Sequence, residues 1–209
     1  MAPPLLPLNV SYTPYWCEEN IYLLCQTFLA DPQISNTWDT YCVFISNQGQ
    51  SVALWNQKKA RESGLPVVWD YHVVLLLRPR FADVASEESW IYDFDADMPI
   101  PCPGREYMEK TFRRDMTQMF QSQFRVISGE VYLDNFASDR THMSVQLKPV
   151  EEMYQSPPPK HAPIEGKEAI RRGMKTNLMS EFVTMEGSVG FGRVTDLEEM
   201  LELCDVRDM

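Results

Sequence analysis

The segment of residues 67–77 constrains the fold of this chain most, because it is apolar on both faces of an extended strand. Apart from Asp70 and His72, every residue of this segment is a valine, a leucine or an aromatic residue. A strand of this composition is buried on both sides, so we expect it to run through the centre of a covered sheet. A chain of 209 residues is long enough to supply that cover within one domain.

Shorter β-forming runs lie on either side of this central segment. Residues 41–46 form an apolar run, the turn signal 47–49 follows, and residues 51–55 can return as a second strand. Residues 89–94 form the next strand. Helical periodicity is found at residues 104–123, 177–185 and 195–204. The pattern predicts an α+β fold with an antiparallel sheet.

A helix is predicted over residues 17–30, and its first residue is a cysteine. Ile21, Leu24, Cys25 and Phe28 recur on one helical face, and Cys17 precedes Ile21 on that face. A thiol in the first helical turn lies near unpaired N–H groups and the positive end of the helix dipole, which lower its pKa from about 8.5. This setting favours a nucleophile. The alternative is a small buried hydrophobic residue, as most free cysteines are.

His72 is the histidine that falls within a predicted strand. If Arg78 pairs with Glu87 across a hairpin, His72 falls opposite Asp93, and directly opposite side chains project to the same face. Asp93 could then hold one imidazole nitrogen and leave the other free. Asp95 has the same parity and is the second candidate, while Asp97 lies further into the following turn. The alternative for His72 and Asp93 is a structural pair.

Net charge limits the classes of partner. The formal charge is −11 at pH 7, and the sequence has no run rich in lysine or arginine. Nucleic acids and anionic membranes are therefore not expected as partners, whereas a cationic group such as a peptide α-ammonium suits this chain. No apolar stretch reaches the length of a membrane span.

Cysteine usage bounds the compartment and the cofactors. The sequence has no Cys-x-x-Cys pair, and its histidines are far apart, so we expect no metal site and no cofactor. The odd number of cysteines and the lack of a secretion signal favour reduced thiols in the cytoplasm or nucleus. The five cysteines are Cys17, Cys25, Cys42, Cys102 and Cys204.

The chain reads as one domain. Residues 1–12 carry three prolines and no basic region, and we expect a flexible N-terminal lead. Residues 13–209 are expected to form a single catalytic domain with a proline-rich surface loop near 156–163. Nothing suggests a symmetric interface, so a monomer is expected.

The order Cys17, His72, Asp93 is that of papain-like and transglutaminase-like cysteine hydrolases, in which a nucleophile helix faces a sheet. Five ordered blocks also resemble the protein N-terminal glutamine amidohydrolase family, and Trp69-Asp70-Tyr71-His72-Val73 is a signature of that family. The chain departs from the family in its first residues, in the loop 78–88, in the proline-rich segment and after Val194; no matched triad residue is lost. The blocks are residues 17–20, 43–47, 68–76, 91–95 and 135–143, and a weaker match follows at 177–194.

The resemblance implies an enzyme that deamidates an N-terminal glutamine to glutamate and releases ammonia. Cys17 would be the nucleophile, His72 the general acid and base, and Asp93 the residue that orients His72, with a thioester intermediate and no cofactor. The implied partners are peptides and proteins with a free N-terminal glutamine. The product would feed the N-degron pathway, in which an arginyltransferase modifies N-terminal glutamate, so other enzymes of that pathway are candidate partners.

Selectivity for a chain terminus requires a group that binds the α-ammonium. The acidic candidates are Glu18, Asp70 and Asp139, with Tyr71 and Ser138 as polar neighbours. Each acidic residue also has a structural alternative: Glu18 complements the helix dipole, Asp70 stabilises a turn, and Asp139 pairs with Arg140.

Two other functional classes remain open at this point. The same triad would serve another cysteine acyl-transfer enzyme, either a peptidase or a transglutaminase-like enzyme. The chain could also be a catalytically silent module that binds peptide N-termini. The product mass separates the enzymes, and the absence of any product would identify the module.

Overall fold

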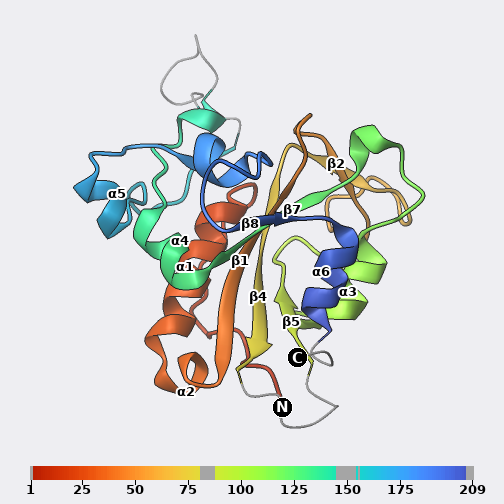
Figure 1. Ribbon diagram of the computed structural model, residues 1–209, viewed down its shortest axis with the longest axis horizontal. Coiled ribbons are helices and arrows are strands. Elements are labelled where there is room, and N and C mark those ends of the chain that lie inside the picture. Colours follow the sequence, from red (N-terminus) through yellow and green to blue (C-terminus); the bar gives the residue numbers. More distant parts are fainter. Residues whose placement is uncertain (1, 81–87, 145–153, 155, 206–209) are drawn as a thin grey trace.

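A computed structural model describes residues 2–80, 88–144, 154 and 156–205 of the chain (Figure 1). Within them, six strands form one antiparallel sheet in the order β6-β5-β4-β1-β7-β8, and two further strands form a separate hairpin. The α+β class with an antiparallel sheet is therefore confirmed. The main sheet consists of β1 (Trp38–Ser46), β4 (His72–Pro79), β5 (Trp90–Tyr92), β6 (Cys102–Pro103), β7 (Gln123–Ser128) and β8 (Arg193–Thr195), and the hairpin of β2 (Val52–Leu54) and β3 (Val67–Trp69).

Helices cover both faces of the main sheet. One face is covered by α1 and α4 together with the π-helical turn η4, and the other by α3, α6 and the small hairpin (Figure 1). The α-helices are α1 (Cys17–Ala30), α2 (Pro32–Ser35), α3 (Gly104–Thr111), α4 (Gly129–Asn135), α5 (Lys167–Arg171) and α6 (Leu197–Cys204). The other helical segments are the 3₁₀ turns η1 (Gln118–Phe120) and η2 (Thr141–Met143) and the π-helix η4 (Leu178–Val183).

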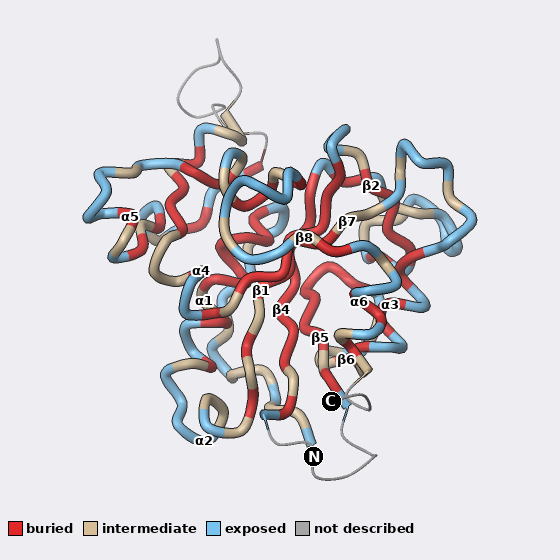
Figure 2. Tube along the Cα trace, viewed as in Figure 1, coloured by how far each residue is buried: buried red, intermediate tan, exposed pale blue. Residues whose placement is uncertain are grey.

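Strand β4 is buried on both sides, as its composition predicts. Val73 and Leu75 pack with α1 in one core, while Val74 and Leu76 pack in the second core with α3 and α6. Figure 2 shows the two central strands, β1 and β4, as largely buried and the peripheral turns as exposed. Truncating Leu75 to alanine would cost about 2–5 kcal/mol because it leaves a cavity in this packing. The sheet is thus a rigid platform for the residues at its ends.

The predicted strand of residues 67–77 is interrupted in the structure. Residues up to Trp69 belong to β3, which pairs with β2, and β4 begins at His72. At the break, the Asp70 side chain accepts the N–H of Tyr71 at 2.9 Å, and the Asp70 carbonyl accepts the hydroxyl of Ser46 at 2.6 Å. A short polar side chain that bonds the neighbouring backbone competes with the ladder of a sheet. The interruption places Asp70 and Tyr71 in a turn beside His72.

Other predicted elements are shorter or shifted. The helix predicted over 104–123 ends at Thr111, whose carbonyl accepts the N–H of Trp55 at 3.0 Å. The element at 177–185 is a π-helix, and residues 51–55 pair with β3 rather than returning along β1. The helix predicted over 195–204 begins at Leu197, because Thr195 still belongs to β8 and Asp196 forms a capping box with Glu199.

The hairpin register also differs from the prediction. Glu87, the expected partner of Arg78, lies outside the described residues. Leu75 pairs with Tyr92 and Leu77 with Trp90, a register shifted by two residues. Its continuation would place His72 opposite Asp95, although β5 ends at Tyr92 before that position.

The N-terminal lead and the proline-rich loop both contact the domain. Tyr92 donates its hydroxyl to the carbonyl of Pro4 at 2.6 Å, and Tyr12 donates to Asp95 at 2.7 Å. Trp16 donates its indole N–H to the carbonyl of Pro157 at 2.9 Å. The mobility of the lead stays a prediction. In the part of the chain that the structure describes, no helix is long and apolar enough to cross a membrane.

Candidate active site

Cys17 is the first residue of α1, and the backbone before it is strained. Tyr15 has a φ of 69°, a left-handed conformation that is uncommon for a bulky side chain. Trp16 precedes the helix, and its side chain bonds Pro157 instead of capping the helix. The first N–H groups of a helix have no acceptor within the helix, so they form a positively polarised end. Cys17 lies at that end and is 7% exposed.

His72 and Asp93 form a buried pair. Nε2 of His72 lies 2.8 Å from Oδ1 of Asp93, and both side chains are almost fully buried. Burial alone would lower the pKa of His72, but the charge and hydrogen bond of Asp93 raise it above its ordinary value. Burial alone would raise the pKa of Asp93, but His72 holds it below its usual range. The sequence-derived pairing of these two residues is therefore observed, although in a different register.

Asp93 is held by further donors. The N–H of Asp95 donates to Oδ1 at 2.9 Å, and the hydroxyl of Tyr107 donates to Oδ2 at 2.8 Å. The amide of Gln57 lies 3.4 Å from the same Oδ2. A carboxylate with this many donors stays ionised. Asp93 can therefore orient His72 over a wide pH range.

The second nitrogen of His72 is unoccupied. Nδ1 is buried and has no hydrogen-bond partner among the described residues. The indole of Trp69 stacks on the imidazole at 5.1 Å between ring centroids and fixes its plane. With Nε2 donating to Asp93, Nδ1 carries the lone pair that can accept a proton.

Cys17 belongs to the same electrostatic neighbourhood, but its predicted low pKa is wrong. Burial raises the pKa of Cys17 well above its usual value, and the negative charges of Glu18 and Asp95 raise it further. The backbone N–H of Val73, the residue after His72, bonds the sulfur and lowers the pKa only in part. The Cys17 thiol lies 3.7 Å from Oε2 of Glu18, to which it donates. Burial and the acidic neighbours therefore outweigh the helix end, and together they favour the thiol form of Cys17.

Glu18 belongs to a buried network that includes a histidine that the sequence reasoning missed. Its Oε2 accepts the hydroxyl of Tyr71 at 3.0 Å. Its Oε1 lies 3.4 Å from Nε2 of His142 and accepts no hydrogen bond from the described residues. Tyr71 and His142 are also 3.2 Å apart. The one sequence signal for His142 was its place in the matched block 135–143.

A cavity of about 300 Å³ opens beside Cys17. Asp70 is exposed on its wall next to Tyr71, and the ammonium of Lys59 lies 3.8 Å from the centre of the Tyr15 ring. The lining combines acidic, aromatic and apolar side chains with the thiol. The full set is Tyr15, Cys17, Lys59, Val67, Val68, Trp69, Asp70, Tyr71 and Met143.

The predicted substrate-binding residues divide into two groups. Glu18, Asp70 and Tyr71 surround Cys17, as described above. Ser138 is buried and accepts the N–H of Arg140 at 3.2 Å, and Asp139 accepts the hydroxyl of Thr141 at 2.6 Å. Neither Ser138 nor Asp139 lines the cavity. Their predicted role in substrate binding therefore gains no support from a contact with the cavity.

Among the residues that the structure describes, one group of side chains has donor atoms close enough for a metal ion. Ligand atoms of His72, Asp93 and Asp95 lie within 4.8 Å of one another, and all three residues are buried. Nε2 of His72 and Oδ1 of Asp93 already bond each other, and Tyr12 occupies Oδ1 of Asp95. The arrangement is that of a hydrogen-bonded network.

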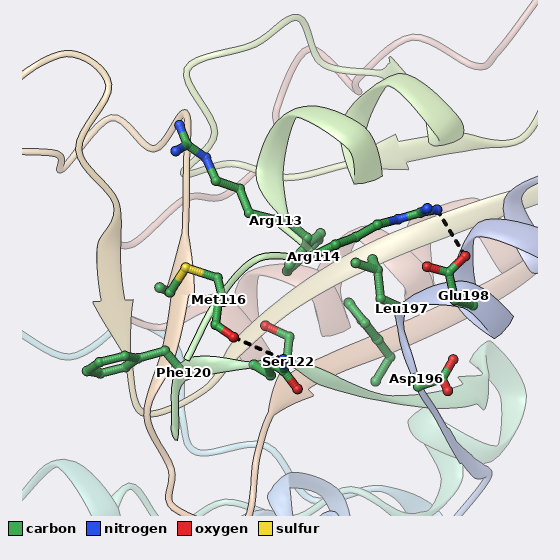
Figure 3. A pocket seen from close by; sticks show the side chains of 12 residues that line it. Arg113, Arg114, Met116, Phe120, Ser122, Asp196, Leu197 and Glu198 are labelled. Carbon is green, nitrogen blue, oxygen red and sulfur yellow. Dashed lines mark hydrogen bonds and ion pairs between the residues drawn. The ribbon is translucent and has the colours of Figure 1, made fainter. Parts of the chain in front are cut away.

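A second hollow lies between α6 and the segment after α3 (Figure 3). Its volume is about 210 Å³. Arg114 spans it to reach Glu198 at 2.9 Å, and Arg113 points away and stacks on Trp55 at 4.4 Å. The hollow is lined by neither cysteine nor histidine, so the thiol chemistry belongs to the cavity at Cys17.

Comparisons with known proteins agree with this assignment. A family model described as N-terminal glutamine amidase matches residues 12–204. A protein N-terminal glutamine amidohydrolase from Bos taurus is 39% identical over 193 residues, which cover 91% of this chain and 84% of that protein. The Homo sapiens protein of the same name is 38% identical and covers 90% of this chain and 84% of its own length. The Arabidopsis thaliana protein of the same name is 34% identical and covers 85% and 76%.

Proposed function

Because this chain belongs to the N-terminal glutamine amidase family and is an amidohydrolase, we propose that it deamidates the side chain of N-terminal glutamine. The product is an N-terminal glutamate, and ammonia is released. The observation that supports this proposal is the buried His72–Asp93 pair: Nδ1 of His72 is free, and the charges of Glu18 and Asp95 act on both His72 and Cys17. A nucleophile, a base and an orienting carboxylate are the minimum set for acyl transfer through a covalent intermediate.

The proposed reaction has two acyl-transfer steps. The Cys17 sulfur attacks the side-chain carbonyl carbon of glutamine, and protonated His72 gives its Nδ1 proton to the leaving nitrogen, which departs as ammonia. The result is a thioester and a neutral imidazole. His72 then takes a proton from water as the oxygen attacks the thioester, and the carboxylic acid leaves Cys17. Asp93 keeps the imidazole in one tautomer through both steps.

The start of α1 also supplies a place for the developing negative charge. We propose that the backbone N–H of Cys17 stabilises the oxyanion, since first-turn N–H groups have no helical acceptor. Losing such a donor typically costs about 10²–10³ in rate. The helix dipole acts in the same direction.

Asp70 is our proposed partner for the α-ammonium of the substrate. It is exposed on the cavity wall, and it lies close enough to Cys17 for its negative charge to raise the pKa of that thiol. Tyr71 shapes the wall, and the buried Glu18 lies behind it. Ser138 and Asp139 shape the turn that carries His142 towards Glu18. Asparagine would be rejected because its shorter side chain leaves the carbonyl short of Cys17.

The remaining proposals concern context. We propose that the domain has a papain-like or transglutaminase-like arrangement, with the nucleophile helix α1 packed on an antiparallel sheet. We further propose that residues 13–209 act as one monomeric domain in the cytoplasm and nucleus. The N-terminal glutamate that it produces would enter the N-degron pathway through arginylation.

Ammonia release and product mass test the proposed function directly. A peptide that begins with glutamine is compared with peptides that carry N-terminal asparagine, internal glutamine or an acetylated N-terminus. We expect ammonia and a product of glutamate mass from the first peptide alone, and none from the Cys17→Ala and Cys17→Ser variants.

Other outcomes identify the alternatives. Cleavage of a peptide bond would make the protein a peptidase, and an amine adduct would make it transglutaminase-like. Binding of the peptide without any product, by both wild type and Cys17→Ser, would make it a recognition module.

A further inference from the structure

In the free protein the thiol of Cys17 faces a buried carboxylate, and this contact favours the protonated sulfur. The thiol of Cys17 points to Oε2 of Glu18 at 3.7 Å and not to an imidazole nitrogen in the described network. Oε1 of Glu18 is buried and accepts no hydrogen bond from the described residues, although Nε2 of His142 lies 3.4 Å from it. Asp70 and Asp95 add their charges from two other segments. A cation that enters beside these carboxylates would favour the thiolate.

We propose that the substrate's own α-ammonium is the activator of Cys17: it binds beside Asp70 and offsets the surrounding carboxylates, so that the thiol proton passes to His72. The inference rests on the function proposed above and concerns the regulation of the same site. Activation involves one proton transfer. The S–H bond of Cys17 breaks, and an N–H bond forms at Nδ1 of His72, which is buried and unoccupied. No oxidant or additional reactant is required.

Asp70 and Glu18 have different roles in this proposal. Asp70 binds the α-ammonium, and the buried charge of Glu18 acts on the sulfur of Cys17. Asp70 is exposed on the wall of the cavity, where a cation can bind and still keep part of its hydration. Glu18 is fully buried behind Cys17 and Tyr71. A buried charge acts over several ångströms with little screening. The ammonium therefore does not need to touch Glu18 to change the balance at the sulfur.

Several other ionisable groups surround the thiol of Cys17. The turn before β4 contributes Asp70 and Tyr71, and β4 contributes His72. The cavity wall carries one cation, Lys59, whose ammonium lies on the Tyr15 ring. Among the described residues, the groups around Cys17 are Glu18 from α1, Asp70, Tyr71 and His72, Asp95 after β5, Tyr12 from the lead, Tyr132 from α4, and Lys59. His142 adds a further group, because it contacts both Glu18 and Tyr71.

This arrangement makes terminal selectivity part of the chemistry. A glutamine within a chain, or one with an acetylated N-terminus, brings no cation into the cavity and leaves Cys17 as a thiol. Such a substrate would lose turnover as well as binding, because the nucleophile itself stays unformed. A thiol held in this way is also protected from unwanted alkylation and oxidation between substrates.

The test follows the thiolate by its ultraviolet absorbance across a pH series, with the Cys17→Ser variant as the baseline. In the free protein, Glu18→Gln removes one carboxylate charge and should move the thiolate midpoint down by about one to three pH units. Asp39→Asn is the matched control. Asp39 is half-exposed at the opposite end of β1 and pairs with Arg80, so the midpoint should not move.

A second arm uses a tripeptide that begins with norleucine, which carries the α-ammonium but has no amide to hydrolyse. Its saturating concentration is set by competition against a glutamine-initiated peptide. We expect the wild-type midpoint to fall when this peptide is bound, and the Asp70→Asn variant to lose that shift. The same norleucine tripeptide with an acetylated N-terminus should leave the thiolate midpoint unchanged.

The outcomes separate the inference from the proposed function. An unchanged midpoint in Glu18→Gln, or in wild type with the norleucine peptide bound, would overturn the inference while glutamine turnover still stands. Absence of turnover with the glutamine-initiated peptide would instead refute the proposed function. If Glu18→Gln fails to fold, Asp95→Asn removes the next carboxylate and must lower the midpoint for the inference to survive.

Discussion

The hydroxyl of Tyr107 donates a 2.8 Å hydrogen bond to Oδ2 of Asp93, on the side opposite His72. Tyr107 lies on α3 and is 1% exposed, so its hydroxyl has no competing water. The contact connects a helix of the second core to the charged pair at the start of β4. It fixes the carboxylate plane and stabilises the ionised form.

Tyr107→Phe should therefore lower turnover without unfolding the domain. We expect kcat to fall about tenfold, since one hydrogen bond to a charged group contributes about 1.5–3 kcal/mol and only part of it acts on the reaction. The pH profile should also change, because a less stabilised Asp93 supports imidazolium less and the pKa of His72 falls. Measuring kcat as a function of pH, and in particular the acidic limb of that profile, checks both expectations. An unaltered pH profile with a lower thermal midpoint would show a purely structural role.

The two neighbouring aspartates should differ sharply in their effect. Asp93→Asn keeps the shape of the side chain but removes the charge that orients His72, and we expect kcat to fall by about 10³–10⁴. Asp95→Asn should stay within about tenfold of wild type, because its carboxylate bonds Tyr12 and not the imidazole. Single-turnover ammonia release would compare the two. Equal losses of kcat in both variants would contradict the assignment of Asp93 as the residue that orients His72.

Folding stability should depend on pH through the same pair. The lowered pKa of Asp93 means that its contribution is present above about pH 3.9 and is lost as the pH falls through its folded-state value. The raised pKa of His72 means that its contribution is complete below about pH 6.5 and is lost as the pH rises through its folded-state value. The free energy of unfolding of wild type should exceed that of Asp93→Asn most between about pH 3.9 and 6.5. Urea unfolding of both proteins across pH would show this; a constant difference would contradict it.

A second buried ion pair fixes the start of α1 to the C-terminal part of the chain. Arg140 contacts both oxygens of Glu19, at 2.8 and 2.7 Å, and it also donates to the carbonyls of Pro159 and His161. Removing one partner leaves a buried charge, so Arg140→Ala should cost about 3–5 kcal/mol of unfolding free energy. Arg140→Lys should also be destabilised because lysine lacks the planar fork that makes two parallel hydrogen bonds to Glu19. Urea midpoints measure both effects. A loss under about 1 kcal/mol would show that water replaces the arginine.

Much of the fold could be predicted from local patterns. The helix at Cys17–Ala30 follows from one clear apolar face, and the burial of β4 on both sides follows from its uninterrupted run of valine and leucine. The break at Asp70 was not predicted, because its cause is a local hydrogen bond to Tyr71 and a distant one from Ser46. Such contacts have no periodic signal in a sequence.

The contact between His72 and Asp93 could be predicted from the sequence, but the electrostatics around Cys17 could not. His72 and Asp93 were paired by parity, which survives a register shift of two residues because side chains alternate. The pKa of Cys17 was predicted in the wrong direction because helix-end arguments count the dipole and omit neighbours that arrive from other elements. Asp95 and Asp70 reach the thiol only in the folded chain. His142 was missed for the same reason, since its contact with Glu18 depends on a turn far along the sequence.

The bond from Trp16 to the Pro157 carbonyl joins the nucleophile to a segment 141 residues later in the chain. Ser156 likewise reaches the carbonyl of Pro14, and Arg140 reaches Glu19. A ribosome makes the N-terminus first, so Cys17 exists long before the groups that seat it. The surroundings of Cys17 are therefore completed only after the proline-rich loop has been synthesised. We expect a polypeptide that stops before this loop to lack the contacts that hold the start of α1.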